Sequence, residues 1–192
     1  MNPRTAPLGA VHPLLDGVAF MFLEKLRSGF EWLLEVITML LVVSLAVIVL
    51  LGVTFRFAGN SLGWYDEVAA VMLAWVTYYG AALAALKRAH ISVPGLVYSQ
   101  PPVVRVVLVA IGEAVILTFF VLLAVYGVHV IQVLGGSTLV SVPIPIAITQ
   151  STIPIGAALY VIAELINLPA ILREAWQGRR PPSEQDIVEE LR

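Results

Sequence analysis

Apolar residues in this chain are gathered into four long runs, at about residues 33–55, 68–86, 106–134 and 146–168. The hydrocarbon core of a bilayer is about 30 Å thick, and a helix of about 20 mostly apolar residues crosses it. No charged residue interrupts the first run after Ile37 or any part of the second. The pattern predicts an all-α integral membrane protein whose four transmembrane helices form one domain over residues 33–170.

The segment before the first run has a different pattern, in which apolar residues recur at helical spacing. That stripe consists of Leu14, Val18, Phe22, Leu26, Phe30 and Leu33. Helices with one apolar face lie in the membrane interface or pack on a partner. We therefore expect residues 1–32 to hold a cytoplasmic tail and an amphipathic interfacial helix of undetermined orientation. A polar-faced extension of the first span fits the same pattern equally well.

Two of the runs predict departures from a straight span of minimal length. The third run, from Val106 to Leu134, would be about 43 Å long at 1.5 Å per residue, which exceeds the hydrocarbon thickness. We expect that helix to tilt or protrude. In the fourth run, Pro154 lacks a backbone donor and predicts a kink.

Basic residues are distributed unevenly over the polar segments between the runs. Of the eleven Lys and Arg residues, all but Arg56 precede the first run, separate the second from the third, or follow the fourth. Lys and Arg close to span ends are retained on the cytoplasmic side. We therefore expect an N-in, C-in topology with residues 171–192 as a cytoplasmic tail, Pro94 inside, and Gly59 and Ser137 outside.

Composition agrees with a membrane protein and excludes some kinds of site. Hydrophobic residues make up 59% of the chain and charged residues 12%, which leaves too little polar surface to cover a soluble core. Because the chain has no Cys, it cannot form disulfides or thiolate–metal sites. The first run is too long for the core of a signal peptide, so we expect it to remain in the mature protein.

The second run is rich in small residues at helical spacing. Ala70 and Ala74 are four positions apart, and Thr77, Ala81 and Ala85 repeat the same interval. Small residues let helix backbones approach closely in lipid, where no hydrophobic effect drives helix association. We expect this run to pack among other helices, either of a partner or of the same subunit.

Few polar side chains within the runs could carry chemistry. Glu113 is an intramembrane carboxylate and thus a candidate functional residue, although a structural pairing with another helix is favoured because it can lie near the cytoplasmic interface. Glu164 is expected at that interface. His12, His90 and His129 fall in separate segments, which argues against a shared metal or haem. We expect that the protein is not an enzyme and that it binds no cofactor, no metal and no nucleic acid.

Lys87, Arg88 and His90 follow the second run at the predicted cytoplasmic face. Cations at such a position can bind the headgroups of anionic membrane lipids. They can equally act as plain topology anchors. Both interpretations stay open on the sequence.

An ordered set of short motifs runs from the end of the first run to the fourth. Its members are Arg56, Trp64-x-x-Glu67, Trp75, Gly80-Ala81, His90-Ile91-Ser92-Val93, Ser141-Val142-Pro143 and Ile153-Pro154-Ile155-Gly156. In order and spacing the set resembles the DctQ-like small membrane subunit of TRAP transporters, over about residues 30–170. The family's basic residue before the His is here the pair Lys87-Arg88, two residues earlier than His90, so no exact role is carried over to it.

The resemblance implies a bacterial inner-membrane protein that serves a tripartite importer driven by a sodium gradient. In such systems a soluble extracytoplasmic receptor delivers an organic anion, such as a carboxylate or sialic acid, to a large multi-span subunit. The small subunit scaffolds the large one and helps to dock the receptor. With the small-residue face, the resemblance gives these expected packing or partner contacts: Arg56, Trp64, Glu67, Ala70, Ala74, Trp75, Gly80, Ala81 and Ala85.

Other interpretations of the same residues remain. Trp64 equally suits an interfacial aromatic belt, and Arg56 can reach the external headgroups by snorkelling. For the whole chain, the alternatives are a four-helix assembly protein of an unrelated membrane complex and a membrane enzyme that uses Glu113 and His129. The sequence does not reveal the substrate, because specificity would reside in the receptor and the large subunit.

Overall fold

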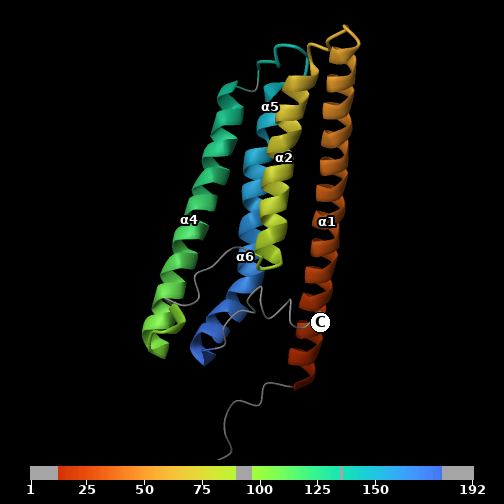
Figure 1. Ribbon diagram of the computed structural model, residues 1–192. Coiled ribbons are helices and arrows are strands. Elements are labelled where there is room, and N and C mark those ends of the chain that lie inside the picture. The colour runs from red at the N-terminus through yellow and green to blue at the C-terminus, as the bar shows by residue number, and fades with distance from the viewer. Residues whose placement is uncertain (1–12, 90–96, 135, 179–192) are drawn as a thin grey trace, which may run out of the picture.

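The protein is almost entirely helical, as the computed structural model of residues 13–89, 97–134 and 136–178 shows (Figure 1). Its helices are α1 (Pro13–Phe57), α2 (Tyr65–Leu86), α4 (Pro102–Leu134), α5 (Ile146–Gln150) and α6 (Thr152–Gln177). Four helical stretches are long and apolar enough to cross a membrane, namely Arg27–Phe57, Tyr65–Leu86, Pro102–Leu134 and Ile146–Gln177. The prediction of an all-α membrane fold with four such helices is confirmed.

The four long helices form a single row in the order α1, α2, α6, α4 (Figure 1). α1 packs on α2, α2 on α6, and α6 on α4, and no other pair of long helices makes a comparable contact within the described residues. α2 and α6 therefore each have two neighbours, whereas α1 and α4 lie at the edges. The helices run between two opposite ends of the structure. We call these the Glu67 end, where α2 starts, and the Lys87 end, just beyond the last residue of α2.

Each contact in the row includes a glycine against which a larger side chain packs. A Cβ added to Gly52 of α1 would lie 2.2 Å from the ring of Tyr65 in α2. A Cβ on Gly156 of α6 would lie 2.4 Å from the Cβ of Tyr78 in α2, and one on Gly127 of α4 would lie 3.0 Å from a proline ring of α6. Small residues thus set the helix spacing at all three interfaces, as expected where packing alone drives association in lipid.

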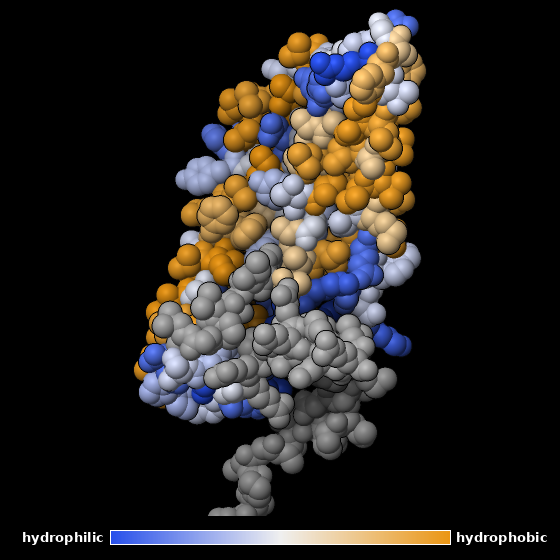
Figure 2. Space-filling model, in the orientation of Figure 1, coloured by the Kyte–Doolittle hydropathy of each residue, from blue (hydrophilic) through white to orange (hydrophobic). Residues whose placement is uncertain are grey.

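The buried core is small and lies toward the Lys87 end. Its buried members are Leu34, Ala82, Ala85, Leu86, Tyr160 and Ala163. The ring of Phe120 from α4 stacks on Tyr160, with centroids 3.7 Å apart and an interplanar angle of 8°. Elsewhere apolar side chains face outward, and hydrophobic residues cover much of the visible face in Figure 2. Such a surface suits lipid or partner helices rather than water.

The N-terminal amphipathic segment is not a separate helix. α1 runs without a break from Pro13 to Phe57, so no helix end marks the boundary expected at residue 32. Of the two interpretations of this segment, the continuous helix matches the extension of the first span. Residues 1–12 lie outside the described part of the chain.

The fourth run is interrupted near its start and is longer than expected. Ser151 separates α5 from α6, one turn before Pro154. Because Pro154 has no N–H to donate to the carbonyl of Gln150, the helix loses a hydrogen bond at that point. α6 then continues to Gln177, well beyond the end expected at residue 168, and it contains Pro169 in its interior. The apolar run predicted a helix that ends before this second proline.

Candidate functional site

At the Glu67 end, one side chain ties α2 to the segment between α4 and α5. The carboxylate of Glu67 accepts hydrogen bonds from the backbone N–H groups of Val140 and Ser141, at 2.9 and 2.7 Å. Glu67 also lies in the first turn of α2, where a negative charge interacts favourably with the positive end of the helix dipole. The carboxylate thus also joins α2 to a segment more than 70 residues away in the chain.

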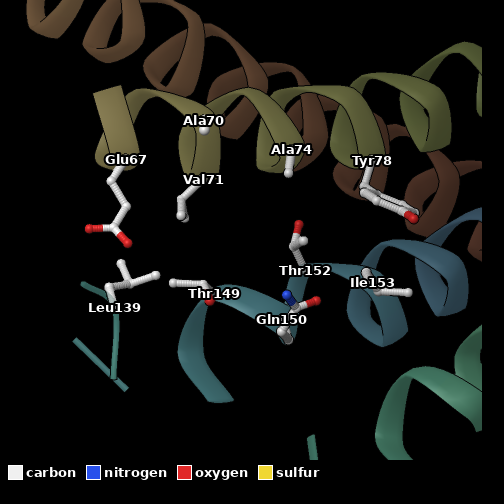
Figure 3. A pocket seen from close by; sticks show the side chains of 10 residues that line it. All are labelled: Glu67, Ala70, Val71, Ala74, Tyr78, Leu139, Thr149, Gln150, Thr152 and Ile153. Carbon is white, nitrogen blue, oxygen red and sulfur yellow. The ribbon is translucent and has the colours of Figure 1, made fainter. Parts of the chain in front are cut away.

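Beside this contact, α2 and the α5–α6 region enclose an open cavity of about 370 Å³ (Figure 3). Ala70, Ala74 and Tyr78 of α2 line one side, and the other side is lined by Thr149, Gln150, Thr152 and Ile153. The hydroxyl of Thr152 points toward the cavity in Figure 3, and its Oγ1 is buried without a hydrogen-bond partner among the described residues. The lining is mostly apolar, so the cavity suits an aliphatic chain or side chain better than a charged substrate.

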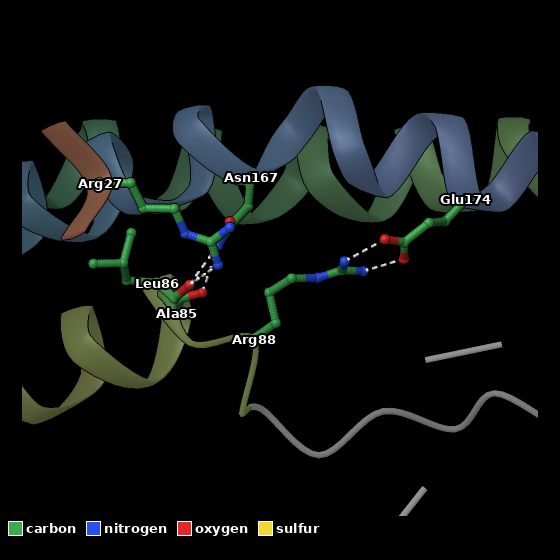
Figure 4. A network of polar contacts seen from close by, with 6 residues as sticks. All are labelled: Arg27, Ala85, Leu86, Arg88, Asn167 and Glu174. Atoms are coloured by element: carbon green, nitrogen blue, oxygen red, sulfur yellow. Dashed lines mark hydrogen bonds and ion pairs between the residues drawn. The ribbon is translucent and has the colours of Figure 1, made fainter. Parts of the chain in front are cut away.

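At the Lys87 end, side chains of other helices satisfy the last carbonyls of α2 (Figure 4). The last carbonyl groups of a helix lack intrahelical partners. Asn167 of α6, which is 1% exposed, donates from Nδ2 to the carbonyls of Ala85 and Leu86 at 2.9 and 3.0 Å. Arg27 of α1 donates to the carbonyl of Leu86 at 3.3 Å. The end of α2 is therefore fixed from both sides of the row.

The two cations that follow α2 extend this attachment. Lys87 pairs with Glu35 and, at 3.6 Å, with Glu31, both on α1. Arg88 makes two hydrogen bonds of 2.8 Å with the carboxylate of Glu174 on α6. Hydrogen bonding to Glu35 raises the pKa of Lys87, and hydrogen bonding to Glu174 raises the pKa of Arg88, so both side chains stay charged. These pairs link α2 to both of its neighbours.

A third cation holds the end of α6. Arg105, which is 8% exposed, donates from Nε to the carbonyl of Ala175 at 2.6 Å, and its guanidinium lies 5.5 Å from the ring centroid of Tyr98. Gly178 ends the helix in the left-handed conformation, with φ of 73°, and a Cβ there would lie 3.1 Å from the guanidinium. Arg105 therefore stabilises a helix end, where a positive charge is favourable.

Two acids meet between α4 and α6. Glu113 of α4 and Glu164 of α6 lie close enough for their carboxyl groups to interact electrostatically. Glu164 is 7% exposed. Oε2 of Glu113 is buried with no hydrogen-bond partner among the described residues.

The other predicted residues are spread from the end of α1 along α2 and do not converge on one site. Arg56 and Trp64 are exposed at the Glu67 end. The rings of Trp75 and Tyr79 lie 5.5 Å apart. Three further positions differ in environment: Gly80 faces open space, Ala81 is half-buried and Ala85 is buried within the subunit. His90 lies outside the described residues.

The structure does not support an enzyme built on Glu113 and His129. Both lie on α4, and their sixteen-residue separation corresponds to about 24 Å along the helix. Within residues 13–89, 97–134 and 136–178, no three His, Asp or Glu side chains come close enough to hold a metal ion. The main polar contacts are those of Asn167, Arg105 and Glu174. They were not predicted from the sequence, because each joins segments that are distant in the chain.

Comparison with known proteins then identifies the family. No curated protein matches the chain closely enough to be reported. The family model described as "Tripartite ATP-independent periplasmic transporters, DctQ component" matches residues 45–174. That match begins within α1 and ends within α6, so it includes the end of α1, all of α2, α4 and α5, most of α6, and the Glu67 contact. The chain is a multi-pass membrane protein that belongs to the DctQ family of tripartite transporter components.

Proposed function

We propose that this chain is the small subunit of a sodium-driven importer of organic anions in a bacterial inner membrane. Its role is to scaffold a large multi-span subunit and to help an extracytoplasmic receptor dock. In this proposal the large subunit carries the substrate and sodium sites, and the small subunit carries no transport site and no catalytic step. Membrane lipids cover whatever surface the partner leaves free.

The observation that carries the proposal is the single row of helices. In a closed four-helix bundle, each helix turns one side inward and the core is complete without a partner. In a row, both broad faces of α2 and α6 stay accessible to other helices. A large subunit can therefore pack along the row without opening it. The cavity beside Ala70 and Ala74 lies on the surface of the row and gives a partner side chain a place to insert.

The polar contacts support a rigid scaffold. Hydrogen bonds and ion pairs join α2 to α1 and α6 at the Lys87 end, and Glu67 joins α2 to the segment after α4 at the other end. A scaffold has to keep its shape while its partner moves. Contacts at both ends of the row restrain the helices from sliding past one another.

The proposed orientation places the Lys87 end in the cytoplasm and can be tested by thiol labelling. The chain has no native Cys, so single-Cys variants report cleanly. In intact cells, Ser137→Cys is expected to react with a membrane-impermeant thiol reagent, whereas Gln177→Cys is expected to react only after lysis. Both positions are exposed in the structure. The reverse labelling pattern would invert the topology and contradict the orientation.

The transport role is tested by reconstitution into liposomes. Purified alone, the subunit is expected to move no organic anion, with or without a sodium gradient. Combined with its large subunit and the receptor, it is expected to be required for uptake. Uptake by the large subunit and receptor alone, at the rate of the full system, would rule out the scaffold role. Uptake by the small subunit alone would show that it carries a transport site.

A further inference from the structure

The segment between α4 and α5 forms a short ordered loop at the Glu67 end. The N–H of Leu139 donates to the carbonyl of Ile144 at 3.0 Å, and the N–H of Ile146 donates to that of Ser137 at 2.8 Å. An antiparallel bridge pairs Thr138 with Pro145. We call residues 137–145 the hairpin loop. These two backbone hydrogen bonds close the base of the loop and restrict the position of its tip relative to the helices.

Glu67 fixes the tip of the hairpin loop from the side. Its two carboxylate oxygens accept hydrogen bonds from the consecutive N–H groups of Val140 and Ser141. Charge-assisted hydrogen bonds of this kind are about twice as strong as neutral ones. The tip is therefore connected to the first turn of α2 as well as to its own base.

The side chain at this tip is apolar and almost completely uncovered. Val140 is 97% exposed, the highest fraction among the large apolar side chains of the described residues. Its exposed neighbours in the loop are Ser137, Thr138 and Ser141, which carry hydroxyl groups, and Pro143 and Pro145. An apolar side chain that stands beside hydroxyl groups resembles the anchor of a protein contact site, which polar groups surround.

We infer that the hairpin loop is a docking element for the soluble receptor, with Val140 as its apolar anchor and Glu67 as a positioning residue. The inference rests on the proposed function, in which the Glu67 end faces the extracytoplasmic side and meets a soluble receptor there. Val140 enters a small apolar recess on the receptor, and the surrounding hydroxyl groups form hydrogen bonds at its rim. Because Glu67 holds the loop before the receptor arrives, little ordering entropy is lost on docking.

The anchor is tested by binding of the substrate-loaded receptor to the complete membrane complex in nanodiscs. Val140→Glu is expected to weaken receptor binding about tenfold, because it places a charge where an apolar side chain is buried. Ser61→Glu adds the same charge to the exposed α1–α2 turn at the same end, and it should leave binding within about twofold. Equal effects of the two substitutions would overturn the inference, since a general charge effect would then explain both. A loss of large-subunit assembly in Val140→Glu would also overturn it.

The positioning role is tested with Glu67→Gln, which keeps the size of the side chain but leaves a single acceptor oxygen. Hydrogen exchange at the amides of Val140 and Ser141 is expected to accelerate about tenfold or more. The receptor concentration for half-maximal uptake should rise, while the rate at saturating receptor stays unchanged. Asp66→Asn, at the neighbouring exposed acid, removes none of the described hydrogen bonds to the loop, so it should change neither the amide exchange nor the receptor requirement. A lower saturating rate with an unchanged receptor requirement would overturn the positioning role.

These results can be told apart from a failure of the proposed function. If the wild-type complex binds the receptor and neither Val140→Glu nor Glu67→Gln alters that binding, the docking element is wrong and the importer role stands. If the wild-type complex neither binds nor needs a receptor, the proposed function itself is wrong.

Discussion

Gly156→Ala is expected to separate α2 from α6 and to lower the free energy of unfolding by roughly 1–3 kcal/mol. The added Cβ would lie 2.4 Å from the Cβ of Tyr78. That atom is attached directly to the backbone of α2, so it cannot turn aside as the end of a long side chain can. The two inner helices of the row must move apart instead. Tryptophan fluorescence during unfolding in mixed detergent micelles measures the loss, since the chain contains four Trp.

The matched control is Gly80→Ala, at a glycine of α2 where a Cβ would meet no atom within 4 Å. Alanine favours a helix over glycine by up to about 1 kcal/mol in water, so this substitution should not destabilise the protein. The same substitution type thus separates close packing from helix propensity. If Gly156→Ala were as stable as Gly80→Ala, the inner pair would tolerate a wider spacing and the tight contact would carry little energy.

Asn167→Leu is the second substitution for which we expect a large effect, a loss of roughly 1–3 kcal/mol. Leucine has a similar volume, so the packing stays filled while both hydrogen bonds to the end of α2 disappear. The carbonyl of Ala85 keeps a hydrogen bond from the N–H of Arg88, at 3.0 Å, and that of Leu86 keeps a longer bond from Arg27. Unfolding measured as for Gly156→Ala gives the size of the loss, and faster exchange of amides near the end of α2 would locate it.

Ile166→Ala provides the comparison for Asn167, because it removes an apolar side chain from the adjacent, 37% exposed position of α6. It should cost much less than Asn167→Leu if the buried amide is the source of the stability. Should the two variants unfold alike, the donors that remain, the N–H of Arg88 and the side chain of Arg27, are sufficient for the two carbonyls of α2. The amide of Asn167 would then be dispensable.

Local pattern was enough to predict the helices of this protein. The free energy of transfer into lipid depends mainly on the residues of each segment itself. The four spans therefore followed from hydropathy and length. The break before Pro154 followed equally from one missing donor. Pro169 shows where this reasoning ends. It lies beyond the apolar run, and its place inside α6 depends on contacts such as that of Arg105 with Ala175.

The arrangement of the helices and the polar contacts was not predictable from one sequence. Small residues in the second run indicated close packing, but they did not show that Ala85 packs within the subunit while Ala70 borders an open cavity. The partners of Glu67 and Asn167 are backbone groups, which every residue has, so no residue type marks them in the sequence. The sequence also did not show that Glu113 lies near a second acid, Glu164.

The row also determines how the protein yields to a mechanical load. Tension on the N-terminus reaches α1 first, and α1 can peel away by breaking its single interface with α2. Tension on the C-terminus reaches α6 first, and α6 cannot leave without breaking its interfaces with α2 and α4 together. A membrane-extracting protease would therefore meet less resistance at the N-terminal end of this chain than at the C-terminal end.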